Sequence, residues 1–213
     1  MKHYRMILAT LFVALISFTG LTAQQNKSQS QPKTTEHLKF MGIPMDGSPA
    51  AFANKLKRRG FTLEDPLSPD VIWMTGTFAG VSNSDVFIYK SPATANVYKI
   101  RVTFPAQDSW SQLEIRYNQF KDWLSQKYLL IESTEEFQGY PPSSDSDKMR
   151  KLVLDNCTYL CEYGAGSSEG AFLGMVYLTI RGDSSVYDEG YVGIEYQDYL
   201  NALKAEQGFL EDL

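Results

Sequence analysis

Residues 96–104 alternate between two kinds of side chain, and this alternation constrains the fold more than any other feature of the chain. Tyr98, Ile100, Val102 and Phe104 are apolar, whereas lysine, arginine and threonine stand between them. Successive side chains of a β-strand point to opposite faces of its sheet. The pattern therefore predicts a strand with one buried face and one face near solvent.

Similar short segments, separated by turn residues, lie on both sides of this one. The intervals between neighbouring segments are too short for parallel crossovers, so we expect antiparallel meanders. The strand segments are predicted near 61–64, 71–79, 85–90, 96–104, 128–133, 157–163, 171–181 and 191–197.

Two helices have clear signals in the first part of the chain. The helix over 49–59 has Ser48 as its N-cap, Pro49 at its first position and Gly60 directly after its basic end. A second helix over 109–127 carries apolar residues at steps of three and four. It begins with Ser-Trp-Ser-Gln, which fits a capping box.

A similar order of elements is predicted again in the second part of the chain. Asp145 or Ser146 is expected to cap a short helix, three strand segments follow, and a last helix covers roughly 198–206. We therefore predict a single α+β domain over 39–213 with an antiparallel sheet of about seven or eight strands and helices on one face. The two pseudo-repeats are predicted at about 39–138 and 139–213.

The alternation divides the strand residues between two faces of the sheet. An aliphatic and aromatic face would bury the helices, whereas a mixed face can stay open to water in an antiparallel sheet. The covered face is predicted to hold Ile72, Met74, Phe78, Ile100, Val102, Phe104, Leu160, Val176, Leu178, Val192 and Ile194. The open face is predicted to hold Trp73, Thr75, Thr77, Lys99, Arg101, Thr103, Tyr159, Tyr163, Tyr177, Tyr191 and Glu195.

Aromatic residues on the open face indicate a ligand-binding surface. Tyrosine and tryptophan bury a large area on binding at a small cost in conformational entropy. Cross-strand aromatic pairs that only stabilise the sheet are the alternative interpretation. The candidate ligand-binding residues are Trp73, Arg101, Tyr159, Tyr163, Tyr177 and Tyr191.

The first 23 residues have the order of a secretory signal peptide. Lys2 and Arg5 belong to a basic start, residues 6–22 are mostly apolar and uncharged, and Ala23 stands at the expected cleavage site. A single N-terminal anchor helix is the alternative, and no second apolar run long enough to span a membrane follows. We expect an exported bacterial protein, either periplasmic or secreted.

The segment after the predicted cleavage site is polar, and 24–38 is predicted to be a disordered tether. Cleavage removes Lys2 and Arg5 but no acidic residue, so the net charge changes from −5 to −7. An acidic chain gains nothing from phosphate backbones or anionic lipid, so nucleic acid is not an expected partner.

Cys157 and Cys161 are the two cysteines. Four residues apart on one strand, their Cα atoms would lie about 13 Å apart, which is too far for a disulfide. We expect two free, mostly buried thiols. His37 is the single histidine after the predicted signal peptide, so no metal site and no cofactor are predicted.

No catalytic residue is predicted. The sequence 166–170 matches G-x-S-x-G, but a strand follows it and no histidine lies downstream, so a hairpin loop explains it. Asp183, Asp188 and Glu189 crowd one loop, and a pair of carboxylates there could act on a glycosidic bond. Acidic residues are also ordinary in an exposed hairpin, and both readings stay open.

The first helix, the strands after it and the return of the pattern after Ser146 form a layout shared with a known family. The residues that carry it are 49–59, Phe52, Leu56, Gly60, Trp73 and Ile100. This layout, over most of residues 39–200, resembles the β-lactamase-inhibitor-protein-like fold. In that family tandem helix–meander repeats build one curved sheet whose open face binds protein partners. The family uses disulfides, and in this respect the chain departs from it.

These features predict a binding or inhibitor-like module that is not an enzyme. Its partner would be a protein, a peptide or a glycan bound on the open aromatic and polar face. The two alternatives are a carboxylate enzyme acting on envelope or extracellular polymers and a structural component of the envelope. Fold alone does not choose among them.

Overall fold

The computed structural model describes residues 35–65, 67–182 and 189–204 of the 213-residue chain. The predicted signal peptide and most of the predicted tether lie outside the described residues. Residues 199–204 are helical. The other elements are β1 (Lys39–Phe40), β2 (Ile43–Pro44), α1 (Pro49–Lys57), β3 (Thr62–Leu63), β4 (Val71–Phe78), β5 (Val81–Lys90), β6 (Val97–Thr103), α2 (Trp110–Ser125), β7 (Leu129–Phe137), α3 (Asp145–Val153), β8 (Cys157–Gly166), β9 (Phe172–Gly182) and β10 (Gly190–Asp198).

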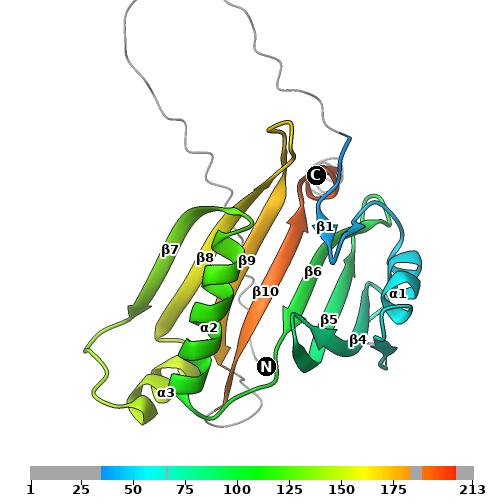
Figure 1. Ribbon diagram of the computed structural model, residues 1–213. Helices are drawn as coiled ribbons and strands as arrows, with labels where there is room; N and C mark the ends of the chain where they lie inside the picture. The colour runs from blue at the N-terminus through cyan, green and yellow to red at the C-terminus, as the bar shows by residue number, and fades with distance from the viewer. Residues whose placement is uncertain (1–34, 66, 183–188, 205–213) are drawn as a thin grey trace, which may run out of the picture. The chain divides into compact units, whose positions relative to one another are not determined.

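Eight of the strands form one antiparallel sheet in the order β3-β4-β5-β6-β10-β9-β8-β7. The first meander runs from β3 to β6 and the second from β7 to β10, and they join where β6 pairs with β10 (Figure 1). Both halves of the chain therefore share one continuous sheet. The predicted α+β class with an antiparallel sheet of about seven or eight strands is confirmed, and the sheet has eight.

The boundary between the two halves lies earlier than predicted. The strand predicted at 128–133 belongs to the second meander and not to the first pseudo-repeat, because β7 pairs with β8. Each half is thus one helix followed by four strands, with α3 inserted between β7 and β8. The Pro-rich break at 140–144 suggested a boundary between repeats, whereas it is a connection inside the second one.

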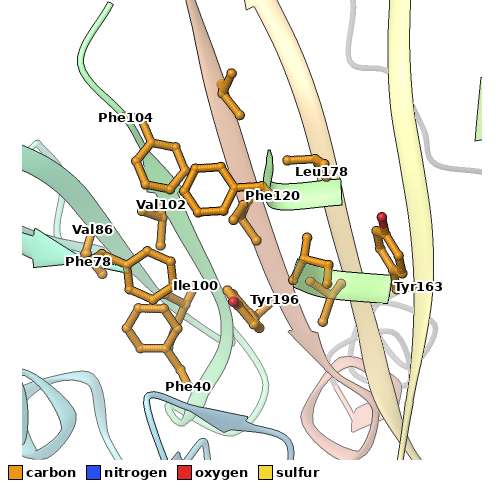
Figure 2. Packing of buried hydrophobic residues seen from close by; sticks show 14 of the residues in the cluster. Phe40, Phe78, Val86, Ile100, Val102, Phe104, Phe120, Tyr163, Leu178 and Tyr196 are labelled. Atoms are coloured by element: carbon orange, nitrogen blue, oxygen red, sulfur yellow. The ribbon is translucent and has the colours of Figure 1, made fainter. Parts of the chain in front are cut away.

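The helices α1 and α2 cover one face of the sheet. α1 packs against β4 and β5, and α2 packs across β8, β9 and β10 (Figure 1). Phe40 contacts both meanders, because its ring centroid lies 5.2 Å from that of Phe78 in β4 and 5.2 Å from that of Tyr196 in β10 (Figure 2). Phe104 stacks on Phe120 of α2, with 4.3 Å between the ring centroids (Figure 2). Each such ring stabilises the fold by about 1.5–3 kcal/mol through burial.

Phe40 belongs to the hairpin β1–β2, which no pattern in the sequence predicts. Each strand of this hairpin has two residues, so no alternation could reveal it. The predicted tether was also too long, because Leu38 is buried in the core. Its backbone N–H donates to Asp198 Oδ2 at 2.8 Å, and His37 Nδ1 lies 3.0 Å from Asp198 Oδ1. Residues 37 and 38 are therefore part of the domain.

Asp198 also begins the last helix, since its Oδ1 accepts from the N–H of Asn201 at 2.9 Å. The Asn201 amide in turn donates to the backbone carbonyls of Met45 and Val97 at 2.7 and 2.9 Å. Both side chains are fully buried. This pair ties the start of the described chain to its end and to β6.

The first predicted helix is confirmed together with its signals. Ser48 Oγ accepts from the N–H of Ala51 at 3.3 Å, and Pro49 is the first helical residue. Gly60 follows the helix with φ +89°, a conformation that residues with a Cβ rarely adopt.

The capping box predicted for the second helix is wrong. Ser109 makes no side-chain cap to α2, and its hydroxyl donates to Asp145 Oδ2 at 3.1 Å. Asp145 Oδ1 accepts from the N–H and the hydroxyl of Ser111 at 3.0 and 2.8 Å, so a residue of α3 caps α2. The N-cap of α3 is Ser144, not Asp145 or Ser146. The local sequence contains no signal for a cap that comes from 34 residues away.

Both cysteines are free thiols on β8, as predicted. Cys161 is fully buried, and its Sγ lies 3.0 Å from the hydroxyl of Tyr117 and 3.3 Å from that of Ser133. Cys157 is partly buried, and burial raises the pKa of its thiol to about 12.

Candidate functional site

The face of the sheet opposite to α1 and α2, here called the open face, carries a row of polar and aromatic side chains. Each residue of the row lies directly opposite the next in the strand pairing, from β4 at one end to β7 at the other. The row consists of Trp73, Phe87, Arg101, Glu195, Tyr177, Glu162 and Glu132. The adjacent residues along these strands, such as Val86, Val102 and Leu178, are fully buried on the covered face.

The indole of Trp73 is held in place by its neighbours on the open face. It stacks on Phe87 with 6.0 Å between ring centroids and 20° between planes. Its Nε1–H donates to Asp85 Oδ1 at 2.9 Å, and the hydroxyl of Thr75 donates to the same oxygen at 2.8 Å. An aromatic pair fixed in this way can contact a ligand with little loss of side-chain entropy.

A second group of charges lies beside this pair. Arg101 donates from Nε and Nη2 to Glu195 Oε2 at 3.1 and 2.9 Å. Lys99 Nζ lies 3.8 Å from the same oxygen and 4.4 Å from the centroid of the Tyr89 ring. Burial lowers the pKa of Lys99, and the nearby Glu195 carboxylate opposes that effect. The group is thus partly desolvated, which strengthens its electrostatic interactions.

The open face is hollowed next to these residues. The hollow has a volume of about 470 Å³. It lies against β5, β6 and the start of β10, where the two meanders meet. Its lining combines aromatic rings, one guanidinium and, among the described residues, one carboxylate. The lining residues are Leu67, Asp85, Phe87, Tyr89, Arg101, Thr103, Phe104, Pro105, Ala106, Gly182 and Tyr191.

Four of the six predicted site residues lie on the open face. Arg101 and Tyr191 line the hollow, and Trp73 borders it through its contacts with Phe87 and Asp85. Tyr177 lies further along the row, opposite Glu195. Its pKa is raised to about 12, first by burial and then by the charges of Glu162 and Glu195.

The other two predicted site residues, Tyr159 and Tyr163, lie on the covered face, so their assignment to the open face was wrong. Tyr163 is fully buried and its hydroxyl donates to the carbonyl of Lys121 at 3.2 Å. Tyr159 packs edge-on against Trp110 at 4.8 Å. Burial is the main cause that raises the pKa of both tyrosines to about 12.

The error on β8 came from a shift of one residue in the assignment of faces. The prediction places Leu160 inward because it is aliphatic. All residues of the strand are then assigned to the wrong face. In the structure Cys161 and Ala165 face the core with the two tyrosines, and Leu160 lies on the open face opposite Thr179. The aromatic residues of α2 make room for tyrosine rings in that core.

Sequence reasoning missed three residues that line the hollow from one strand: Asp85, Phe87 and Tyr89. They alternate with Val86 and Ile88, which are fully buried. The alternation within the segment at 85–90 is the signal that assigns these three residues to the open face. Leu67 follows β3 in a connecting segment, and no pattern in the sequence indicates its place.

Asp183 and Asp188, the candidate carboxylates for glycoside chemistry, lie outside the described residues. Across residues 35–65, 67–182 and 189–204, no group of three or more histidine, cysteine, aspartate or glutamate side chains could hold a metal ion. No helix in those same ranges is both long enough and apolar enough to cross a membrane.

The comparisons with known proteins give no relative for this chain. No protein-family model, no curated protein and no solved structure matches it.

Proposed function

We propose that this chain is an exported, non-catalytic binding module that holds a protein or peptide partner against the hollow of the open face. One observation carries the proposal. Three aromatic rings, Phe87, Tyr89 and Tyr191, converge with Arg101 on a hollow that no described helix covers. Aromatic residues and arginine are the types that contribute most to binding energy at protein interfaces.

The charges of the hollow favour a partner with both apolar and polar groups. Arg101 uses Nε and Nη2 to bind Glu195, and its Nη1 donates no hydrogen bond to any of the described residues. Asp85 accepts both of its hydrogen bonds on Oδ1. A donor and an acceptor are therefore available beside the rings, as a peptide backbone or a polar side chain requires.

The resemblance of the layout to the β-lactamase-inhibitor-protein-like fold supports a protein as the partner. In that family the open face of the sheet is the binding surface. Here the candidate surface lies on the corresponding face, at the junction of the two meanders. We propose this correspondence as a hypothesis about the face used, not about the identity of the partner.

The test uses variants that block the hollow without touching the core. Ala106 is exposed and lines the hollow, so Ala106→Trp would fill it. Leu67 is 61 % exposed at its rim, and Leu67→Glu would place a charge there. Matched controls are Ala50→Trp on the exposed side of α1 and Ile115→Glu on α2, where the isoleucine is 70 % exposed.

Each variant is immobilised and exposed to envelope and culture-medium fractions of the source cells. A captured protein or glycan is identified, purified and titrated against each variant by calorimetry. We expect binding to fall by at least about tenfold in both hollow variants and to persist in both controls. A ligand that binds all four variants equally would show that the hollow is not its site.

Export itself is proposed from residues 1–23, which lie outside the described residues. Expression of the full chain in a bacterial host is expected to give a periplasmic or secreted product that begins at Gln24, as mass spectrometry of the N-terminal peptide would show. A product that retains Met1 and stays with the membrane would support the anchor-helix alternative.

A further inference from the structure

The two edges of the eight-stranded sheet differ in length and exposure. One edge is β3, which has two residues, and the other is β7, which has nine. Within the described residues β7 pairs with β8 alone, so its outer edge is unpaired (Figure 1). An unpaired edge of this length offers backbone N–H and C=O groups to another extended chain, and proteins usually protect such edges.

Apolar side chains are exposed at the start of β7. Leu129 is 74 % exposed and Ile131 is 57 % exposed, and Phe172 at the start of β9 is 41 % exposed. Ile131 occupies an irregularity in the pairing between Leu130 and Glu132. We call Leu129, Ile131 and Phe172 the edge patch.

Gly164 of β8 lies beneath the edge patch. A Cβ on Gly164 would lie 3.2 Å from Ile131 Cδ1 and 3.8 Å from Phe172 Cε2, so the two side chains approach each other above a residue that has none. Gly164 is also directly opposite Leu129 in the pairing. The three apolar side chains therefore gather around one position of the open face, next to the free edge.

Two carboxylates lie beside the edge patch without a cation. Glu132 and Glu162 are directly opposite each other across β7 and β8, and neither makes an ion pair or a hydrogen bond in the described part of the chain. Burial raises the pKa of Glu162, and the charge of Glu132 raises it further. By contrast, Glu135 on the covered side of β7 is paired with Lys121. Like charges directly opposite each other destabilise a sheet, so a cation between them would be favourable.

We propose that the free edge of β7 binds an extended, cationic segment of a partner protein, which adds as a further strand to the sheet. The backbone of the segment pairs with β7. Its apolar side chains pack on the edge patch, and a lysine or arginine lies next to Glu132 and extends over the open face of β7 toward Glu162. Backbone pairing of this kind supplies affinity, and the alternate side chains supply specificity.

Charge selects this partner over two others. A second copy of the chain would bring the same carboxylates and, after the predicted cleavage, the same net negative charge to the contact. An anionic lipid surface would be repelled for the same reason. A basic segment instead removes the repulsion between two carboxylates that this chain leaves unpaired.

The test uses a synthetic peptide of about ten residues in which threonine alternates with valine over one half and with lysine over the other, so that valine and lysine share one face of the extended peptide. In a second peptide glutamate replaces lysine. Binding is measured by calorimetry at about 0.15 M salt, and hydrogen exchange of the protein is followed by mass spectrometry with and without peptide. The variants are Glu132→Gln/Glu162→Gln and Ile131→Ser. Their controls are Asp65→Asn/Glu169→Gln, which removes two exposed charges elsewhere, and Leu154→Ser, where the leucine is 60 % exposed.

We expect the lysine peptide to bind the unmodified protein, to protect the backbone amides of β7 from exchange and to lose at least about tenfold in affinity with either edge variant. Both control variants should bind the lysine peptide as tightly as the unmodified protein does. The glutamate peptide should not bind. Absence of binding, equal binding to the charge variant and its control, or protection confined to other strands would each overturn the proposal. The proposal does not depend on the hollow, so Ala106→Trp should bind the lysine peptide normally.

Discussion

The guanidinium of Arg101 is bound to the carboxylate of Glu195 across the line where the two halves of the sheet meet. Two donors of Arg101 lie 3.1 and 2.9 Å from one oxygen of Glu195, although the residues are 94 positions apart in the chain. Both side chains are half-buried on the open face. The ion pair thus belongs both to the joint between β6 and β10 and to the proposed binding surface.

A double-mutant cycle with Arg101→Ala and Glu195→Ala should give a coupling free energy of about 1 kcal/mol. The pair is partly desolvated, so its coupling should exceed that of an exposed surface pair. Urea denaturation at low salt and at about 1 M salt would measure it, and the coupling should fall with salt because the pair is not fully buried. Zero coupling at low salt would contradict the prediction.

Asp198→Ala is expected to lower the free energy of unfolding by about 3 kcal/mol, because it leaves the buried N–H groups of Leu38 and Asn201 without their acceptor. Denaturant unfolding measures this change. Asp70→Ala is the control, since Asp70 is exposed and makes an ion pair with Lys90. A change of less than about 1 kcal/mol in that control is expected. Equal effects of the two substitutions would show that the Asp198 contacts do not hold the ends of the domain together.

Asp145→Ala should destabilise the protein by about 1 kcal/mol at neutral pH through loss of the cap on α2. Slight burial raises the pKa of Asp145, but the hydrogen bonds from Ser111 and Ser109 outweigh it and the net pKa lies below 3.8. A carboxyl with a lowered pKa stabilises the fold above its unfolded pKa and loses this effect as the pH falls. The difference between variant and wild type should therefore shrink below about pH 3.8 in acid titrations of stability. Asp108→Ala, which removes a nearby exposed carboxylate, is the matched control and should change the free energy of unfolding by less than about 0.5 kcal/mol at neutral pH.

In contrast to Asp145→Ala, Glu162→Gln should stabilise the protein and increase the free energy of unfolding by about 0.5 kcal/mol at pH 7. The pKa of Glu162 is raised above 4.5, so the wild type loses stability as the pH rises through that raised value. The gain of the variant should therefore vanish as the pH falls below about 4.5, where the carboxyl is protonated in both states. Glu132→Gln removes the repulsion but not the burial of Glu162, so its gain should be smaller. A loss of stability in either variant at pH 7 would show that the two carboxylates do not repel each other.

The two thiols should react slowly in the native protein and rapidly after denaturation. Burial raises the pKa of Cys157 to about 12, and the thiolate is the reactive form, while Cys161 is not accessible. A disulfide-exchange reagent followed by absorbance should release two equivalents in urea and far less without it. Recovery of a peptide in which Cys157 is bridged to Cys161 would contradict their placement on one strand.

The fold was largely predictable because the strands are long and strongly patterned. All eight strand segments appear in the sheet, and α1 has both of its predicted terminal signals. The features that could not be predicted from the sequence depend on contacts between residues that are distant in the chain. The cap of α2 comes from Asp145, and the hairpin that contains Phe40 is held by packing against the sheet.

The candidate site was predictable where the alternation was regular and failed where it was ambiguous. Trp73 and Arg101 stand in strands with a clean alternation and lie on the open face. On β8 the series from Cys157 to Tyr163 contains aromatic or aliphatic residues in both phases, so hydrophobicity alone could not fix which phase faces the core. The answer depended on the aromatic side chains of α2, which belong to another part of the chain.

The join between β6 and β10 has a consequence for how the chain reaches its native state. Among the described strands β10 is the last in chain order, yet it lies between two strands near the centre of the sheet. Until β10 is present, β6 and β9 each have a free edge. The pairing of β10 with β6, for example of Ile194 with Val102, joins segments from the two halves of the chain. Such long-range closure is slow. The eight-stranded sheet should therefore stay open until β10 is available, and a chain in that loosely structured state can still be threaded through a narrow channel.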